Sequence, residues 1–326
     1  MARVNTNTPV LSIKDLRTYF HTPDGIAKAV DGASYHVNPG ETLGVVGESG
    51  CGKSVTALSI LRLIPMPPGE IVSGEVLFDG NDLLALPMNM MRQIRGNRIS
   101  MIFQEPMTSL NPVFTIGYQL SKVFTLHQNL SGKAARQKAA DVLAACEIAS
   151  PARILKAYPH ELSGGMRQRA MIAMALGCNP AVLIADEPTT ALDVTIQAQI
   201  LDLMLRLKEK FGMALILITH DLGIVAKSAQ RVVVMYAGEK VEEAGVERLF
   251  EKPGHPYTIA LMKSLPVLGR KEKFLEEIKG VVPAPYREIA GCKFADRCSE
   301  VITACHQQRP SLKEIEAGHL VACIRR

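Results

Sequence analysis

The chain has 326 residues, of which 47% are hydrophobic and 21% are charged, which is enough apolar material for a full core and excludes a mainly disordered protein. The net charge of +5 is small, and the Lys and Arg residues are mixed with Asp and Glu, which argues against a nucleic-acid-binding face. No apolar run reaches the roughly 18 residues of a membrane-spanning helix. The N-terminus lacks the apolar stretch of a signal peptide, so we expect a cytoplasmic protein that would serve a membrane only by docking on another subunit.

The first part of the chain is predicted to form β-strands joined by turns. Residues 8–46 carry short apolar alternations, broken at Pro23-Asp24-Gly25 and Asn38-Pro39-Gly40. Leu43–Val46 reads as a short buried strand, and it leads into the glycine-rich segment Gly47–Ser54. An apolar, Leu-rich stretch then runs to Ile64. Strand, glycine-rich loop and helix in this order form the context that a phosphate-binding loop requires.

Further along, helical and strand patterns alternate. Residues 119–178 read mostly as helices, and Val182–Ala185 and Ala214–Ile218 read as two short apolar strands with a helix from Ile196 to Lys210 between them. This alternation predicts an α/β fold with a mainly parallel sheet. We expect one domain over residues 1–250, with a helical subdomain at about 107–178.

The composition of the sequence changes near residue 250, where a loop-rich tail with many prolines begins. We expect residues 251–326 to form a small second domain. Four of the seven cysteines lie in this tail. A disulfide is not expected in a cytosolic protein.

The segment Gly47–Ser54 matches the spacing GxxxxGKS of a phosphate loop. Its glycines let backbone N–H groups converge on phosphate oxygens, at the positive end of the following helix. Lys53 can reach the β and γ phosphates, and the Ser54 hydroxyl can ligate magnesium. The residues expected to surround the ATP phosphates are Gly47, Glu48, Ser49, Gly50, Cys51, Gly52, Lys53 and Ser54.

Polar residues follow three of the expected strands. Asp186 ends the strand Val182–Ala185 and is a candidate magnesium ligand, and Glu187 is placed to polarise the attacking water. An exposed acidic turn is the alternative for this pair. His220 could donate a hydrogen bond to the γ-phosphate, although a histidine there is more often structural, and Gln104 is by itself an ordinary polar residue.

The segment Leu162-Ser163-Gly164-Gly165-Met166 distinguishes between classes of phosphate-loop protein. It lies between the phosphate loop and Asp186, where ABC ATPases carry their signature motif, although the usual form ends in Gln rather than Met166. With these motifs in order, residues 8–250 resemble an ABC transporter ATPase. In that family two ATPase domains face each other and sandwich ATP between the phosphate loop of one and the signature of the other.

The resemblance implies a role for each matching residue. Gln104 would sense the metal and touch the permease contact, and Glu187 would be the general base. His220 would be the switch histidine, and Asp193 in Thr190-Ala191-Leu192-Asp193 would cross the dimer interface. Ser163, Gly164 and Gly165 are implied to cap the partner's ATP. Phe20 is implied to stack on adenine, with Tyr19 as the second candidate.

Three further segments resemble dipeptide and oligopeptide importers, in particular their D-type ATPase subunit: Phe103–Pro112, Val234–Gly238 and His255-Pro256-Tyr257-Thr258. The resemblance implies two transmembrane permease subunits, a second related ATPase subunit and, indirectly, an extracytoplasmic peptide-binding protein. It also implies a place at the cytoplasmic face of the cell membrane. Nickel importers share many of these motifs. A soluble ABC ATPase acting on nucleic acid or ribosomes and a phosphate-loop kinase are the alternatives from other classes.

The tail cysteines Cys292, Cys298, Cys305 and Cys323 have the spacing C-x5-C-x6-C-x17-C. Four thiols in a loop-rich segment suggest a thiolate metal site that cross-links it. These spacings are longer than those of most zinc fingers. The resemblance to D-type subunits implies a [4Fe–4S] cluster; zinc, unligated thiols or a disulfide are the alternatives.

Overall fold

A computed structural model describes residues 8–104, 109–189, 193–264 and 277–326. The chain divides into two compact units. Unit 1 is built mainly from Ala85–Ile216, together with Val37–Glu41. Unit 2 holds Leu11–His36, Thr42–Leu84 and Leu217–Arg326. The domain boundary near residue 250 stays a prediction.

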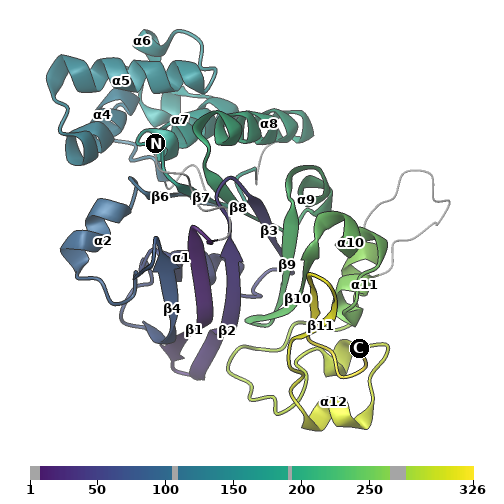
Figure 1. Ribbon diagram of the computed structural model, residues 1–326. Coiled ribbons are helices and arrows are strands. Elements are labelled where there is room, and N and C mark those ends of the chain that lie inside the picture. The colour runs from purple at the N-terminus through teal and green to yellow at the C-terminus, as the bar shows by residue number, and fades with distance from the viewer. Residues whose placement is uncertain (1–7, 105–108, 190–192, 265–276) are drawn as a thin grey trace. The chain divides into compact units, whose positions relative to one another are not determined.

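Unit 1 is mainly helical (Figure 1). Its helices are α2 (Met88–Ile94), α4 (Ile116–Gln128), α5 (Gly132–Ala145), α6 (Pro151–Ile154), α7 (Gly164–Leu176) and α8 (Val194–Phe211), with a 3-10 turn at Pro159–Glu161. Helices α4, α5 and α7 pack on one another and bury Leu120, Phe124, Ala139 and Leu143. The helices expected over residues 119–178 and 196–210 are therefore present.

Two parallel strands complete the interior of unit 1. Strand β6 (Ile99–Ile102) pairs in parallel with β7 (Val182–Asp186), and β7 lies between β6 and β8 (Ala214–Thr219), which begins in this unit. Every residue of β7 and β8 is buried. Continuous apolar strands of this kind fit a parallel sheet that is covered on both faces.

Unit 2 contains two groups of strands. The first is a four-stranded sheet in the order β2-β1-β4-β5, formed by β2 (Gly25–Val37), β1 (Leu11–Thr22), β4 (Gly69–Phe78) and β5 (Asn81–Asp82). The second runs β11-β12-β10-β9-β3, formed by β11 (Lys313–Glu316), β12 (His319–Val321), β10 (Glu239–Gly245), β9 (Arg231–Tyr236) and β3 (Thr42–Val46). Its helices are α1 (Lys53–Ile60), α9 (Leu222–Ser228), α10 (Val246–Glu251), α11 (Pro256–Lys263) and α12 (Thr303–Gln307).

The pairing in unit 2 is more varied than the sequence predicts. Strand β3 runs parallel to β9, as expected for the strand before a phosphate loop. The pairs β9–β10, β10–β12 and β11–β12 are antiparallel, so the tail adds a hairpin to the edge of this group. Helix α1 ends at Ile60 rather than at Ile64. The sequence predicted strands within residues 8–46 but not the separate four-stranded sheet that they form with β4 and β5. The tail strands were not predicted because short polar strands carry a weak periodic signal.

An aromatic cluster joins the tail to the rest of unit 2. Tyr236 of β9, Tyr257 of α11 and Phe294 are buried, with ring centroids 4.6 to 5.4 Å apart. Buried aromatic pairs of this kind contribute about 0.5–1.5 kcal/mol each beyond the area that they bury. The tail is therefore part of the core of unit 2, although its sequence is rich in proline and loops.

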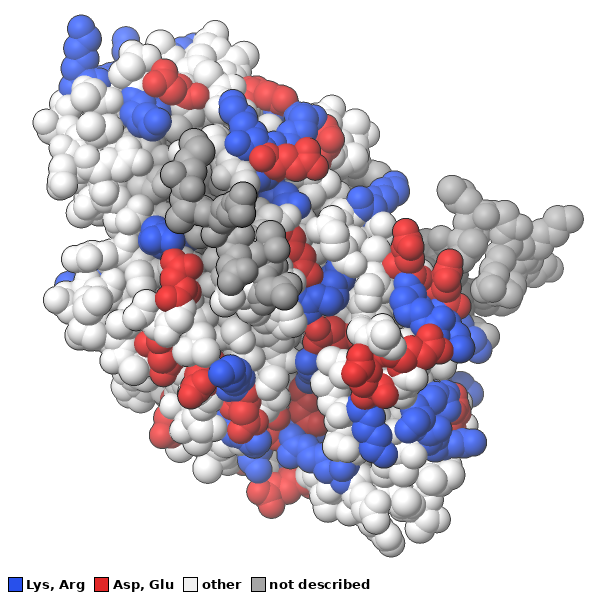
Figure 2. All heavy atoms as spheres, viewed as in Figure 1, with Lys and Arg blue, Asp and Glu red and all other residues white. Residues whose placement is uncertain are grey.

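The charges are interspersed on the surface that Figure 2 shows, where Lys and Arg side chains lie next to Asp and Glu side chains. None of the helices in the described parts of the chain has the length and apolar character needed to cross a membrane.

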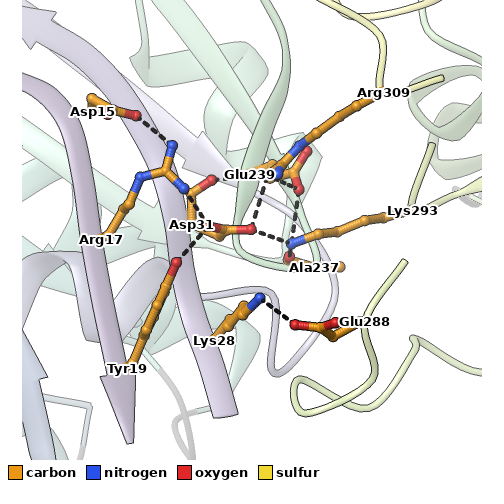
Figure 3. Close-up of polar contacts among 10 residues, drawn as sticks. All are labelled: Asp15, Arg17, Tyr19, Lys28, Asp31, Ala237, Glu239, Glu288, Lys293 and Arg309. Atoms are coloured by element: carbon orange, nitrogen blue, oxygen red, sulfur yellow. Dashed lines mark hydrogen bonds and ion pairs between the residues drawn. The ribbon is translucent and has the colours of Figure 1, made fainter. Parts of the chain in front are cut away.

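A buried carboxylate holds the tail against β2. Asp31 of β2, whose side chain is 5% exposed, accepts hydrogen bonds from Arg17 and Tyr19 of β1 and from Lys293 and Arg309 of the tail (Figure 3). The Lys293 ammonium, Tyr19 and the Arg309 guanidinium lower the pKa of Asp31 to about 2, against the opposing effect of burial. A carboxylate with several cationic partners stabilises the folded chain only while it is ionised.

Asp31 should make unit 2 sensitive to acid. Its pKa in the folded protein lies below the ordinary value, so its contribution of about 2 kcal/mol is complete above about pH 4 and is lost as the pH falls towards 2. Thermal melts of the wild type and of Asp31→Asn should therefore differ at pH 6, and the difference should shrink below about pH 4 and be lost at about pH 2. Asp24→Asn, an exposed change of the same charge, is the control. A difference between wild type and Asp31→Asn that does not depend on pH would contradict this account.

Candidate active site

The phosphate loop Gly47–Ser54 lies in unit 2 between β3 and α1, as predicted. Its glycines are required by the backbone. Gly47 has φ 152°, and a Cβ there would lie 2.2 Å from the carbonyl oxygen of Met235. Gly52 has φ 98°, and a Cβ there would lie 2.4 Å from the carbonyl oxygen of Ala29. The loop thus winds against β9 and β2 in a conformation that only glycine tolerates.

The Lys53 side chain folds back along this loop. It is 5% exposed, and its ammonium donates to the carbonyl oxygens of Gly47, at 2.7 Å, and Glu48, at 3.0 Å. Cys51 is fully buried beside it, with Sγ 3.6 Å from the ammonium. Burial raises the pKa of the Cys51 thiol, so it is protonated and adds no charge to the loop. The Lys53 ammonium is therefore held by carbonyl oxygens of the loop itself.

The motif His255-Pro256-Tyr257-Thr258 contacts the phosphate loop through Tyr257. His255 Nδ1 accepts the N–H of Tyr257 at 3.0 Å and caps α11, and burial lowers the pKa of His255 to about 3, which keeps it neutral. The Tyr257 hydroxyl in turn accepts the N–H of Glu48 at 2.8 Å. This contact joins residues 209 apart in the sequence, and no local pattern predicts it.

The two aromatic candidates for adenine lie on opposite faces of β1, because successive side chains of a strand alternate. The Tyr19 hydroxyl donates to Asp31 at 2.9 Å, and the Lys28 ammonium lies 6.0 Å from the centroid of its ring. Phe20 is half-buried and pairs with Gly69 of β4. Both residues belong to unit 2, as the phosphate loop does, and both are half-buried.

In unit 1, β7 ends at Asp186, which is 4% exposed, and Glu187 follows with φ 44°. The amide of Gln104, just after β6, donates to the Glu187 carboxylate at 3.2 Å. Because β6 and β7 are parallel neighbours, their carboxyl ends meet at one edge of the sheet. Gln104 is thereby brought to the same sheet edge as Asp186 and Glu187, which lie 82 and 83 positions later in the sequence.

Two buried or half-buried glutamines support the segment after Glu187, and the sequence did not single out either for a role. Gln168 of α7 donates through its amide to the carbonyl oxygen of Pro188, and Gln197 of α8 donates to that of Thr189 at 3.1 Å. Gln168 lies two positions after Met166 and is 1% exposed. The sequence could have pointed to Gln168 because it is a polar residue on the buried face of α7, which is mostly apolar there.

The predicted signature lies at the start of α7. Ser163 is the N-cap, and its Oγ accepts the N–H of Met166 at 3.3 Å. Ser163 and Gly164 are exposed, so the amides of this helix start face solvent. Asp193 likewise caps α8, where its Oδ1 accepts the N–H of Ile196 at 2.9 Å. Both residues thus have a local structural role, and their roles in ATP binding remain predictions.

The other candidates are placed as follows. His220 is exposed directly after β8, and Asp221 beside it caps α9. Ser54 is half-buried in the first turn of α1. The motif residues Glu105–Thr108 and Thr190–Leu192 lie outside the described residues.

The four tail cysteines line one small pocket in unit 2 and form no disulfide. The backbone N–H of Cys292 donates to the carbonyl oxygen of Cys305 at 2.7 Å. Burial raises the pKa of the Cys292 thiol to about 11. The charges of Cys305, Cys298 and Cys323 act in the same direction, and a hydrogen bond opposes them. Among residues 8–104, 109–189, 193–264 and 277–326, no three His, Cys, Asp or Glu side chains form a group that could hold a metal ion.

Comparisons with known proteins agree with this geometry. Residues 30–190 match the model of the ABC transporter family, and residues 241–305 match that of the oligopeptide/dipeptide transporter C-terminal region. A probable peptide ABC transporter ATP-binding protein of Sinorhizobium fredii is 55% identical over 97% of this chain and 95% of its own length. The chain belongs to the ABC transporter ATP-binding family. An oligopeptide transport ATP-binding protein of Bacillus subtilis is 50% identical over 96% of each chain.

The ABC fold is also seen in a solved structure. A dimeric ATP-binding cassette in a post-hydrolysis state, bound to ADP and Pi, has a TM-score of 0.65 and 27% identity, and covers 72% of this chain and 98% of its own. This chain is thus an ABC-type ATPase of the phosphate-loop fold, with the C-terminal region of peptide transporters. The predicted α/β fold class and ATPase class are confirmed.

The close approach at Gly47 predicts that Gly47→Ala disrupts the loop. The added Cβ would meet the Met235 carbonyl oxygen and the strained φ costs on the order of 1–3 kcal/mol, so ATP affinity should fall about tenfold or more. Titration with a fluorescent ATP analogue measures this. Gly245→Ala is the matched control, because Gly245 has φ −57° and open space around its Cβ position. Equal ATP affinity for both variants would be the contrary result.

Proposed function

We propose that this ABC ATPase drives the import of dipeptides or oligopeptides through a membrane permease, and that Glu187 is its general base. The observation that carries the catalytic assignment is the hydrogen bond from Gln104 to Glu187, because it joins a metal-sensing and a water-activating candidate at one sheet edge. The relatives named above, which are described as peptide and oligopeptide transport proteins, support the substrate class.

The residues of this chain divide the work as follows. The amides of the loop Gly47–Ser54 and the Lys53 ammonium bind the phosphates and stabilise charge on the transferring group. Glu187 accepts a proton from the attacking water, and Gln104 orients the Glu187 carboxylate. His220 donates a hydrogen bond to the γ-phosphate. Phe20 stacks on adenine, because the Tyr19 ring already lies under Lys28 and its hydroxyl is held by Asp31.

Magnesium fits the oxygen donors of Ser54, Gln104 and Asp186, which are the hard ligands that this ion prefers. When bound, it would neutralise charge on the phosphates. We assign Asp186 to it because its carboxylate lies at the end of β7, at the sheet edge where Gln104 meets Glu187.

The partners follow from the same assignment. Peptide-importer ATPase subunits work with membrane permease subunits, and we propose two of these and a second, related ATPase subunit whose ATP is capped by Ser163, Gly164 and Gly165. An extracytoplasmic peptide-binding protein would deliver the solute. A groove of about 250 Å³ in unit 1, lined in part by Phe103, Leu126 and Met171, is our candidate for the permease contact.

The proposed location is the cytoplasmic face of the membrane, held there by the permease. The exposed apolar side chains Phe103 and Leu126 near Gln104 support a protein contact. The mixed charges on the face in Figure 2 argue against the alternative of an ATPase acting on nucleic acid, which needs a basic face.

Glu187→Gln should bind ATP and hydrolyse it at least about 100-fold more slowly, because the amide cannot accept the proton of water. Steady-state ATPase assays and ATP-analogue titration measure the two properties. Glu209→Gln, an exposed change on α8, should leave both unchanged. Turnover by Glu187→Gln at the wild-type rate would remove Glu187 from the mechanism.

We also propose that Cys292, Cys298, Cys305 and Cys323 hold a [4Fe–4S] cluster as a structural cross-link. Four thiols lining one pocket are the donor set of such a cluster. A single zinc ion needs four sulfurs about 2.3 Å from one point. Zinc is the alternative metal for these four thiols.

Protein purified without oxygen should be brown and contain about four iron and four sulfide per chain. Cys305→Ser should lose most of the iron, while Cys178→Ser, a half-buried thiol of unit 1, should retain it. Elemental analysis and absorption spectroscopy provide the measurement. A colourless wild type with one zinc per chain would contradict the cluster.

A further inference from the structure

Arg297 connects the cysteine segment to the phosphate loop within unit 2. It ends the short 3-10 turn Ala295–Arg297 and directly precedes Cys298. Its side chain is 5% exposed, and all five N–H donors of its guanidinium are used. The acceptors are Lys279 O at 3.0 Å from Nε, Glu48 Oε2 at 2.7 Å and Tyr236 OH at 3.2 Å from Nη1, and Glu48 Oε1 at 3.0 Å and Ile278 O at 3.3 Å from Nη2.

Glu48 is the residue after Gly47 in the phosphate loop, and the C-terminal extension holds both of its polar ends. Arg297 binds its carboxylate through two parallel hydrogen bonds, and the Tyr257 hydroxyl accepts its backbone N–H. A two-point guanidinium–carboxylate pair fixes orientation as well as distance. The backbone conformation at the start of the loop is thus set from outside the loop.

The charge of Glu48 matters because the loop binds a polyanion. An unpaired carboxylate next to the phosphate site would repel the triphosphate, and partial burial would weaken the screening of that repulsion by solvent. The guanidinium of Arg297 neutralises this charge through two hydrogen bonds to the carboxylate. A lysine could not replace it, because an ammonium has three donors and no planar fork.

We propose that Arg297 is a positioning residue for ATP binding: it neutralises and orients Glu48, so that the phosphate loop reaches its binding conformation only when the turn before Cys298 is in place. This inference rests on the proposed binding of ATP at Gly47–Ser54. It gives the C-terminal extension a direct influence on nucleotide affinity. A residue that only attached the C-terminal extension to unit 2 would not need to contact the phosphate loop, as Arg297 does.

The chain offers a matched control for that distinction. Arg309 also lies in the tail and is bound to buried Asp31 and to Glu239, but it has no hydrogen bond to the loop. Asp31 keeps Lys293 and Arg17 as partners when Arg309 is changed. Arg309→Gln therefore disturbs the docking of the tail without exposing a charge at the phosphate loop.

The test compares full-length Arg297→Gln, Glu48→Gln, the double variant and Arg309→Gln. Titration with a fluorescent ATP analogue should show about tenfold weaker binding for Arg297→Gln, the effect of one unneutralised charge close to a polyanion. The double variant should recover to within about threefold of the wild type, because it has no carboxylate to neutralise. KM for ATP should rise in Arg297→Gln while kcat changes little.

Glu48→Gln alone leaves no carboxylate to repel the triphosphate but loses the two-point pair, so its ATP affinity should lie between those of Arg297→Gln and the wild type, and a loss as large as that of Arg297→Gln would also overturn the proposal. Melting without nucleotide compares the fold of Arg297→Gln with that of Arg309→Gln. Wild-type affinity in Arg297→Gln, no recovery in the double variant, or equal loss in Arg309→Gln would overturn the proposal. A wild type that binds no ATP would instead refute the proposed function.

Discussion

The proposed ATP site depends on backbone that approaches its neighbours closely, without a side chain in between. In the phosphate loop this is possible because Gly47 and Gly52 adopt positive φ and pass within van der Waals contact of β9 and β2. Contacts from outside the loop hold its first residues, because the N–H of Glu48 donates to the Tyr257 hydroxyl and the Glu48 carboxylate binds Arg297. Its conformation must therefore be imposed by what surrounds it, and in unit 2 the surroundings are β3, α1 and the C-terminal extension.

The extension is attached to unit 2 in three ways that act on different parts of it. The aromatic cluster of Tyr236, Tyr257 and Phe294 buries apolar surface. The Asp31 network holds Lys293 and Arg309 against β2. The pair of Arg297 with Glu48 reaches the phosphate loop itself. A cross-link among the four cysteines would stabilise the segment 292–323, which carries at least one residue of each of these three contacts.

Local features of the site were predictable from the sequence. The strand, loop and helix around Lys53 follow from glycine spacing and an apolar run, and the meeting of Gln104 with Glu187 follows from parallel strands that end at one edge. Helix α8 was predicted to within two residues at its N-terminus because its apolar stripe is regular. The end of α1 was placed too late because the apolar residues after Ile60 continue in a turn, where Arg62 has φ 52°.

Long-range contacts were beyond a single sequence. Glu48 and Arg297 are 249 positions apart, and each alone reads as an exposed charge. The central claim, ATP bound by the amides of Gly47–Ser54, is tested most directly by a crystal structure of the Glu187→Gln variant with ATP and magnesium. The account predicts the triphosphate inside this loop, with Lys53 on its β and γ phosphates. An empty loop, with nucleotide bound elsewhere on the chain, would contradict it.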